Sequence, residues 1–462
     1  MDTQRSGQTL FDQLGLSKSA PKASPAGYSD RENLGRFALI ALLVLVFLGP
    51  IMTFGSLSLS DQGSTERQIG YVVVFVLTIY AAFPTATRLS FVAMPWPVLL
   101  VLGWCWLSLI WSISPSDSFR RLVLTTTVTW TVFLVVRHAG YRSTIEIIRW
   151  CLVGAVILSY IVVFVDPQTG IHPMADSAAA TASAGQWRGF LGHKNFAGAV
   201  CALCIVTFIF DASRFPVFLR LTVIALAGYF LFRTESKTSA GMLGLAVLGG
   251  IMFVNLGQRA RAYLMPILTV MACIIWGLLN AYGDFLRTTF LNPKAFTGRG
   301  QIWTALLNYA SDHRMLGSGY GSFWNIGGQS PIFSYGQGFV TEITVGHSGY
   351  IDQLAAVGLP GVLLMIFAAI IWPFLKLIGS QGLEPSKGAL ISSLLIFCIG
   401  HNVTESGLFE RDAIVSVFLL FTIAFAQHAG DGKRRARSED SGDELLRTMR
   451  RRQKAATAEA PA

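Results

Sequence analysis

Long runs of apolar residues, separated by short polar stretches, repeat along nearly the whole chain. A helix crosses the hydrocarbon core of a bilayer with about 20 apolar residues, and most of these runs have about 17 to 22. They contain few charged residues, as membrane-spanning helices do. The pattern predicts an all-α, polytopic membrane protein with about 12 transmembrane helices, near residues 37–54, 69–84, 95–113, 121–136, 149–165, 194–211, 216–233, 238–256, 263–280, 348–378, 388–402 and 411–428.

A long segment of different composition, 281–346, separates the ninth run from the tenth and is rich in polar residues, glycine and aromatic residues. Within it, GRGQIWTALLNYASDHR has Ile302, Leu306, Leu307 and Ala310 at the spacing of an amphipathic helix, which we expect on or under the membrane surface. The glycine- and serine-rich stretch that follows predicts an irregular but ordered lid. The chain thus divides into a basic tail, nine spans, a large loop, three spans and a second basic tail, at 1–36, 37–280, 281–346, 347–428 and 429–462.

The composition excludes an ordinary soluble protein. Mean hydropathy is +0.53 and 13% of the residues are charged, whereas soluble domains have about 25% charged residues. The first apolar run follows a polar tail, so we expect a retained span and not a cleaved signal peptide. Cys201 and Cys204 form a CxxC pair, but inside an apolar helix, so packing is favoured over redox chemistry.

The net charge of +10 comes largely from the two tails. Basic flanks usually stay on the cytoplasmic side, and an even number of spans returns both tails to that side. The two longest loops, 166–193 and 281–346, then face outward. Nucleic-acid-binding proteins also have basic tails, but beside a helix end attraction to lipid headgroups is favoured, and we expect no nucleic-acid partner. The turn FRTESKTSAG is interpreted as an interfacial charge cluster of Arg233, Glu235 and Lys237.

Basic residues that suit an anion occur on both long outer loops. In WRGFLGHKN, Arg188 and Lys194 come just before a span, and the fixed donor fork of an arginine suits phosphate. In TGRGQIW, Arg299 lies between glycines at the start of the surface helix, where its guanidinium and the backbone amides can converge on an anion. Flanking bases also commonly snorkel to headgroups, and the residues alone leave this alternative open.

His347 opens a spanning helix in VGHSGYIDQLAAVGLPG, next to the water interface. A neutral imidazole there can take a proton from a hydroxyl, although a lone interfacial histidine is more often only hydrogen-bonded. Ser348 and Asp352 share a helix face, and Glu405 lies on the next outer loop, in GHNVTESGLFERD. His347 is therefore a candidate base with carboxylates nearby.

The sequence gives no support for metal or nucleotide chemistry. The seven histidines are scattered, and we find neither a DxD or HExxH pattern nor a Walker or Rossmann loop. Energy for any reaction or transport then has to come from the substrate itself or from an ion gradient.

Four motifs carry a resemblance to a known family. They are RGFLGHKN before a span, SKTSAG at a later span, GRGQIW followed by LGSGYGSFW, and HSGYIDQLAAVGLPG after the large loop. The chain resembles the O-antigen ligase and Wzy-type polymerase superfamily over residues 37–428. The HKN and GYGSFW segments are most similar to exopolysaccharide polymerases found with succinoglycan-type gene clusters. Each motif is weak alone, and their order and spacing make the resemblance specific.

The resemblance implies a GT-C-like fold in the bacterial inner (cytoplasmic) membrane, with both termini cytoplasmic and the large loop periplasmic. It implies a glycosyltransferase that uses undecaprenyl-pyrophosphate-linked sugar without metal or cofactor. Arg188 and Arg299 match basic residues that hold the lipid pyrophosphate, and Lys194 is a further candidate. His347 matches the histidine of an HSx(9)G pattern, which fits through Gly358, and would be the general base of an inverting displacement.

Four further residues are secondary candidates. Arg314 and Glu405 are charged groups on the same outer loops. Tyr320 and Trp324, interleaved with glycine, suit stacking on sugar rings, and equally suit anchoring at the membrane interface.

Three functions compete at this point. The first is a polymerase that transfers a growing lipid-linked glycan onto the next lipid-linked repeat unit, so that donor and acceptor are both partners. The second is a ligase that transfers a finished glycan to lipid A-core. A polyprenyl-sugar transporter is disfavoured because the charges lie at the outer ends of spans and not at the midplane. The C-terminal stretch DELLRTMRRRQK suits a chain-length regulator as partner or, more simply, lipid headgroups.

Overall fold

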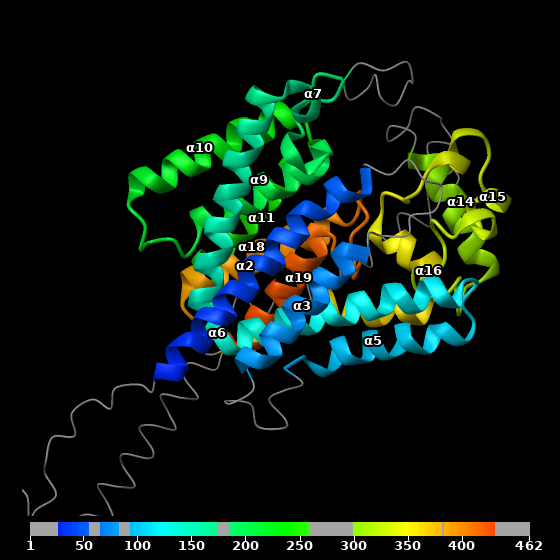
Figure 1. Cartoon of the computed structure of the whole chain (residues 1–462), viewed down its shortest axis with the longest axis horizontal. Coiled ribbons are helices and arrows are strands. Elements are labelled where there is room, and N and C mark those ends of the chain that lie inside the picture. Colours follow the sequence, from blue (N-terminus) through cyan, green and yellow to red (C-terminus); the bar gives the residue numbers. More distant parts are fainter. Residues whose placement is uncertain are drawn as a thin grey trace, which may run out of the picture.

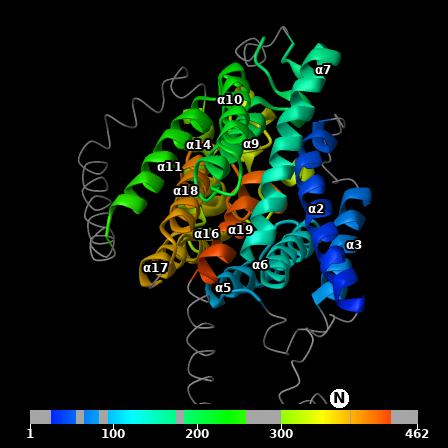
Figure 2. The same cartoon turned by 90° about the vertical axis from the view of Figure 1, so that its left-hand side faces the viewer.

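The computed structural model describes residues 26–54, 65–82, 93–173, 184–257, 299–380 and 383–429. Within these ranges the chain is helical, and the one β-bridge joins Ile171 to Trp187. Figures 1 and 2 show a bundle in which α2, α3, α6, α9, α18 and α19 pack side by side, with α14 and α15 at one side. The prediction of an all-α, polytopic membrane protein is confirmed.

Most of the longer helices overlap the predicted apolar runs, except that α14 lies in the polar segment 281–346 and α6 joins two runs. The longer helices are α2 (Ala26–Phe54), α3 (Thr65–Ala82), α5 (Trp96–Leu107), α6 (Pro115–Val165), α9 (Lys194–Ile209), α10 (Val217–Thr234), α11 (Lys237–Asn255), α14 (Arg299–Asp312), α16 (Gly349–Ile366), α17 (Trp372–Gly379), α18 (Pro385–His401) and α19 (Ile414–Gln427). Short turns of helix join them: α7 (Pro167–Gly170), η1 (Ser108–Ile110), η2 (Gly189–Leu191), η4 (Gly327–Gln329), α15 (Ile332–Tyr335), η5 (Gly338–Glu342) and a π-helical turn, η6 (Phe367–Ile371).

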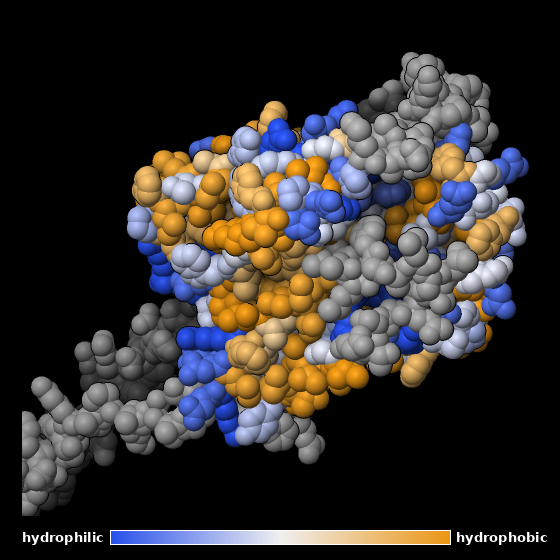
Figure 3. Space-filling model, turned by 45° about the horizontal axis from the view of Figure 1, so that its top comes forward, coloured by the Kyte–Doolittle hydropathy of each residue, from blue (hydrophilic) through white to orange (hydrophobic). Residues whose placement is uncertain are grey.

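Five of the described segments are long and apolar enough to cross a membrane: Asp30–Gly49, Pro115–Val165, Val217–Thr234, Lys237–Asn255 and Gly349–Gly379. Four further apolar helices are shorter. The expected span 263–280 lies outside the described residues, so the number of twelve stays a prediction. Figure 3 shows an apolar band across one face of the molecule, as expected for a surface that meets lipid.

Two glycines with positive φ mark where the helices differ from the predicted apolar runs. Gly140, with φ 75° and ψ 164°, joins the predicted spans 121–136 and 149–165 into the two limbs of α6, which turn away from each other in Figure 1. Gly358, with φ 69°, breaks the predicted span 348–378. A Cβ at Gly358 would lie 2.3 Å from the carbonyl oxygen of Met315, so only glycine fits this close approach.

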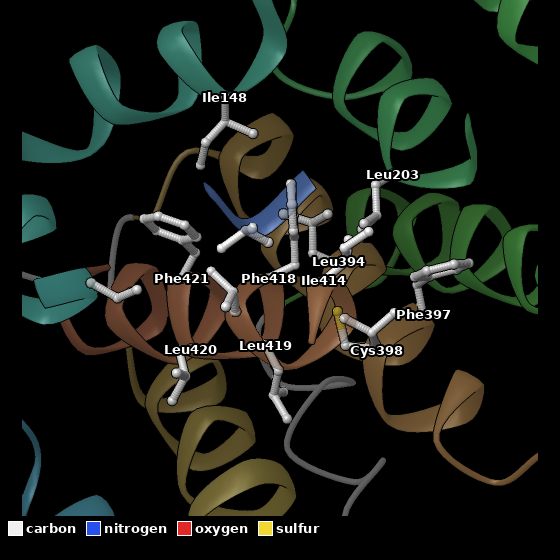
Figure 4. Packing of buried hydrophobic residues seen from close by; sticks show 14 of the residues in the cluster. Ile148, Leu203, Leu394, Phe397, Cys398, Ile414, Phe418, Leu419, Leu420 and Phe421 are labelled. Carbon is white, nitrogen blue, oxygen red and sulfur yellow. The ribbon is translucent and has the colours of Figure 1, made fainter. Parts of the chain in front are cut away.

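The core lies around α19, whose residues Ile414–Ala426 are all buried. A helix that is apolar on every face belongs in the interior of a bundle. Figure 4 shows its phenylalanines meeting Ile148 of α6, Leu203 of α9 and Leu394 of α18. This packing fixes α9 and α18, and so it fixes the polar segments at their ends.

The predicted amphipathic helix is confirmed as α14. Ile302, Leu306 and Ala310 are buried, but Leu307 is 46% exposed because it lies one residue, about 100° of rotation, beyond that face. The glycine-rich stretch after α14 forms turns that close over α16: the Ser318 amide donates to the Ala355 carbonyl at 2.9 Å, and the Leu359 amide donates to the Arg314 carbonyl at 2.8 Å.

Candidate functional site

A buried carboxylate, Glu405, is the centre of the candidate site. It lies on the loop between α18 and α19 and is 8% exposed. Its Oε1 accepts hydrogen bonds from Arg299 Nη2 and from Asn195 Nδ2, both at 2.6 Å. Its Oε2 lies 3.6 Å from Nδ1 of His347. Residues from three distant parts of the chain therefore share one carboxyl group.

The neighbours of Glu405 hold it in its ionised form. Burial alone would raise the pKa of Glu405, but the His347 imidazole and the Arg299 guanidinium outweigh burial and lower this pKa from 4.5 to about 2. Arg299 is held in place by a second hydrogen bond, from Nη1 to the Thr404 carbonyl. The carboxylate is thus a fixed negative charge at neutral pH.

His347 is turned so that one ring nitrogen faces the carboxylate. A carboxylate beside Nδ1 favours the tautomer with the proton on Nδ1, which leaves the lone pair on Nε2. The His347 side chain is 27% exposed, so the ring is accessible to a ligand. Histidine in this setting is suited to accept a proton at Nε2 while the carboxylate stabilises the resulting positive charge.

The backbone around His347 is strained and firmly held. His347 has φ 52°, in the left-handed region that non-glycine residues rarely adopt. The Gly346 carbonyl accepts a hydrogen bond from Trp303 Nε1 at 2.9 Å. The Gly349 amide donates to the carbonyls of Asn402 and Glu405, at 2.9 and 3.1 Å. Surrounding contacts thus maintain a costly conformation that places the imidazole beside Glu405, which is typical of functional sites.

A chain of hydrogen-bonded polar side chains begins at Glu405 and leads to α11 and α18. Asn195, 6% exposed, accepts from Ser236 Oγ at 3.1 Å, and Ser239 Oγ lies 3.0 Å from Ser236 Oγ, within hydrogen-bond distance. Ser239 Oγ lies 3.4 Å from Nε2 of His401, at the end of α18. Sequence reasoning missed these residues, although Asn195 lies in the HKN motif and Ser236 and Ser239 are the two serines of the SKTSAG motif.

The turn with Ser236 had been interpreted only as interfacial charge. Arg233 and Lys237 are exposed, which agrees with that view, but Ser236 between them is 2% exposed and belongs to the site. The available signal was the alternation of charged and small residues in FRTESKTSAG. Small polar residues between exposed charges can turn toward the interior of the protein while the charges stay in water.

Two neutral histidines lie near Glu405 and the basic residues at the start of α9. Burial lowers the pKa of His193 to about 4, against the raising effect of Glu405. Burial, with the charges of Arg188 and Lys194, lowers the pKa of His172 to about 4. The Lys194 amide donates to His172 Nε2 at 3.3 Å. Arg188, Lys194 and the Glu405 cluster therefore lie at the same end of α9.

Arg188 is partly committed to its own loop. Its Nε donates to the Thr169 carbonyl at 2.8 Å, and its Nη2 donates to the Gln168 carbonyl at 3.0 Å. The guanidinium is half-buried and lies against α7, which leaves its Nη1 edge for another group. The structure thus brings Arg299, His347 and Glu405 into contact and places Arg188 and Lys194 beside them.

The other secondary candidates lie farther away. Arg314 is exposed and follows the last residue of α14, about 20 Å along the helix axis from Arg299. Tyr320 is 2% exposed, and its hydroxyl donates to the Phe409 carbonyl at 2.7 Å and meets Thr125 Oγ1 at 2.9 Å, so its ring is part of the core. Neither residue joins the cluster around Glu405.

Trp324 connects to the site indirectly, through Asp352. Its Nε1 donates to Asp352 Oδ1 at 2.9 Å, and Ser406 Oγ donates to the other oxygen of the same carboxylate. Ser406 is the neighbour of Glu405 in the chain. Asp352 therefore joins the glycine-rich stretch, the start of α16 and the Glu405 loop. The sequence had indicated only that Asp352 shares a helix face with Ser348.

The comparisons with known proteins give one family match. Residues 221–366 match the family model described as O-Antigen ligase (Wzy_C). This segment runs from α10 into α16 and contains Arg299 and His347, whereas Asn195 and Glu405 lie outside it. No curated protein matches the chain. Within the described residues, no group of three or more His, Cys, Asp or Glu side chains is arranged to hold a metal ion.

Proposed function

We propose that this chain, a membrane enzyme of the O-antigen ligase and Wzy-type superfamily, polymerises undecaprenyl-pyrophosphate-linked oligosaccharide repeat units into exopolysaccharide. The observation that carries the proposal is the contact of Glu405 with both Arg299 and His347. A histidine oriented by a fixed carboxylate and placed beside a buried arginine is suited to remove a proton from a hydroxyl while an anionic group leaves.

In the proposed reaction, His347 Nε2 takes the proton of an acceptor hydroxyl as its oxygen attacks the anomeric carbon of the donor sugar. The bond from that carbon to the pyrophosphate oxygen breaks, and the electron pair leaves with the lipid pyrophosphate. A single in-line displacement inverts the anomeric carbon. Glu405 keeps Nδ1 of His347 in position and stabilises the imidazolium until its proton passes to solvent.

The leaving pyrophosphate would be stabilised by Arg299, Lys194 and the Nη1 edge of Arg188. Arg299 and Lys194 are partly buried, and fixed charges stabilise an anion far better where water is excluded. Removing Arg299 and Glu405 from water costs free energy that their attraction only partly returns. A pair of this kind is therefore better explained by its use in a reaction than by its contribution to stability.

A ligase is the second candidate, because the matching family model is described as O-Antigen ligase. Donor chemistry would be the same, and lipid A-core would replace the lipid-linked repeat unit as acceptor. We favour the polymerase because of the resemblance of the HKN and GYGSFW segments to exopolysaccharide polymerases. Either enzyme would act at the periplasmic face of the bacterial inner membrane, with both basic tails in the cytoplasm.

Reconstitution of the purified protein with an undecaprenyl-pyrophosphate-linked repeat unit, without added metal, tests the proposal. We expect a ladder of lengthened lipid-linked glycans, which His347→Ala abolishes. His313→Ala is the matched control, because His313 stacks on Tyr309 at the far end of α14, and it should leave the ladder intact.

Each other outcome has a definite meaning. Product that forms only after lipid A-core is added, and that still needs His347, replaces the polymerase by the ligase. Movement of the lipid-linked glycan across the vesicle membrane without any new glycosidic bond, in wild type and His347→Ala alike, overturns both in favour of a transporter.

A further inference from the structure

A groove on the outside of the bundle, between α6 and α10, is separate from the Glu405 cluster. Its volume is about 550 Å³, and it is lined by Ile157, Tyr160, Ile161, Phe164, Val165 and Leu226. The Tyr160 hydroxyl donates to the Leu226 carbonyl at 2.8 Å, which joins the two helices across the groove. The lining is apolar along about two turns of α6, and α10 lies at the edge of the bundle in Figure 1.

The side chains of this groove are open to the membrane in the described part of the chain. Ile157, Ile161 and Leu226 are 49%, 50% and 44% exposed. In a spanning helix such a surface meets lipid tails, so exposure alone would indicate only ordinary lipid contact. What distinguishes this groove is the group at its rim.

An aromatic and cationic rim closes the end of the groove nearest to Glu405. Trp187 packs on Tyr160 and Phe164, with ring centroids 5.9 and 6.0 Å apart. The guanidinium of Arg233 lies 4.9 Å from the Trp187 ring centre, and the Trp187 amide donates to the Arg233 carbonyl at 3.0 Å. A shallow apolar groove that ends at a tryptophan and an exposed arginine is complementary to a lipid tail that ends in a phosphate.

Two chain segments lead from this rim directly to the candidate site. One runs from Trp187 through Arg188 to Asn195, which donates to Glu405. The other runs from Arg233 to Ser236, which donates to Asn195. Gln186 Nε2 joins the two segments through Glu235 at 2.9 Å. The rim and the site are therefore continuous, and Arg188 lies between them.

We propose that the groove between α6 and α10 holds the tail of the polyprenyl donor lipid, with its phosphate end at Arg233 and Arg188 and its sugar directed to Glu405. The inference rests on the proposed function, since it names where that donor is bound. Lipid tails are as apolar as the groove, so the groove contributes orientation and shape selection and little hydrophobic energy. Positioning of this kind is enough to present the anomeric carbon to His347.

The test uses a polyprenyl phosphate with a photoreactive group in its tail, bound to the full-length protein in lipid nanodiscs. We expect label on the peptide that contains 157–165. Ile161→Trp, which fills the groove, should lower labelling about tenfold, whereas Leu158→Trp should not. Leu158 is 42% exposed on the same helix and does not line the groove, so it controls for the bulk of the new side chain.

Labelling that is equal in both variants overturns the proposal. So does labelling by a photoreactive phospholipid that excess polyprenyl phosphate fails to displace, because the groove would then hold bulk lipid. Crosslinks from this face to a second copy of the chain would make it an interface instead.

A transfer assay separates this inference from the proposed function. Ile161→Trp should raise the KM for the full-length polyprenyl donor about tenfold, and leave transfer from a farnesyl-pyrophosphate-linked donor, too short to fill the groove, unchanged. If the wild type transfers from neither donor, the proposed function fails while the labelling result stands. If Ile161→Trp impairs both donors equally, the groove proposal fails and the function stands.

Discussion

Arginines from other helices lie at the two ends of α9, Arg299 partly buried and Arg149 buried, and they are used in opposite ways. At the Lys194 end, Arg299 donates to a carboxylate that also contacts Asn195 and His347. At the Ile209 end, Arg149 is 3% exposed and donates to backbone carbonyls: to Thr207 at 2.8 Å, Phe210 at 3.1 Å and Asp211 at 2.7 Å. Burial of an arginine therefore does not by itself indicate a functional site.

The difference follows from what each arginine finds to bind. The last carbonyls of a helix have no partner within the helix, and arginines at its end can supply one. Arg220 does the same at this end, with hydrogen bonds to the Phe208 and Ile209 carbonyls. An arginine bound to carbonyls has a structural role, because it joins chain segments. An arginine bound to a carboxylate that also contacts a histidine is part of a charge network that a ligand can disturb.

Arg188 lies between these two cases. Two of its nitrogens bind carbonyls of the α7 turn, as Arg149 does at the other end, but it lies at the Lys194 end of α9, next to His172 and Lys194. Its proposed contact with the donor pyrophosphate therefore depends on the remaining edge of the guanidinium.

Replacing Arg299 and Arg149 by glutamine, one at a time, tests this comparison most directly. Arg299→Gln should lower the transfer rate by about 100- to 1000-fold, since an arginine that stabilises a developing anion acts as an oxyanion-hole donor does. Arg149→Gln should instead cost roughly 3 kcal/mol of stability, about 1 for each lost hydrogen bond, and leave the rate per folded molecule unchanged. Thermal unfolding and rates measured on the monodisperse fraction separate the two effects, and equal rate losses would erase the distinction.

The Glu405 carboxylate, near the Lys194 end of α9, should give the protein a stability that depends on pH. The folded-state pKa of Glu405, about 2, lies below its ordinary value of 4.5, so ionisation stabilises the folded protein above pH 4.5. This pH-dependent difference between the ionised and the protonated form, roughly 3 kcal/mol and not the net contribution of the buried pair, is lost as the pH falls from 4.5 through 2. The unfolding midpoints of wild type and Glu405→Gln should therefore converge in that window. A constant difference down to pH 2 would contradict the assignment.

Asn195 and Thr207, in the first and last turns of α9, form a second matched pair. Asn195→Ala removes a hydrogen bond to Glu405 and should lower kcat about tenfold, equivalent to about 1.4 kcal/mol, with little change in KM because the arginines remain. Thr207→Val keeps the backbone carbonyl that Arg149 binds and should leave kcat unchanged. A rise in KM without loss of kcat in Asn195→Ala would instead make Asn195 a substrate-binding residue.

Tyr320 should affect stability and not transfer, as Arg149 does, although it lies in the glycine-rich segment. Its hydroxyl is already bound by Phe409 and Thr125, so Tyr320→Phe should cost about 1 kcal/mol of stability and leave transfer unchanged. Calorimetry and the transfer assay together check this. Loss of activity at unchanged stability would return Tyr320 to the site.

The sequence was sufficient for those features that depend on local pattern. Apolar runs of spanning length can hardly adopt any structure in lipid except a helix, because every backbone group must be satisfied within the segment. The helix at Arg299–Asp312 followed from its apolar spacing, and His347 and Arg299 were recognisable from their motifs. The resemblance to the O-antigen ligase and Wzy-type superfamily is confirmed by the family match over residues 221–366, whereas the likeness to succinoglycan-type polymerases stays a prediction.

Only the tertiary structure decided which of these residues meet. Arg299 and Glu405 are 106 positions apart and Asn195 and Glu405 are 210 apart, so no local spacing connects them. The buried core around α19 fixes the ends of α9 and α18, and this packing brings Asn195 to Glu405. It also makes Tyr320 a core residue and breaks the chain at Gly358, where close approach of the Met315 carbonyl leaves no room for a side chain. Side-chain type limits what chemistry is available, and packing over long distances in the chain determines which groups can perform it.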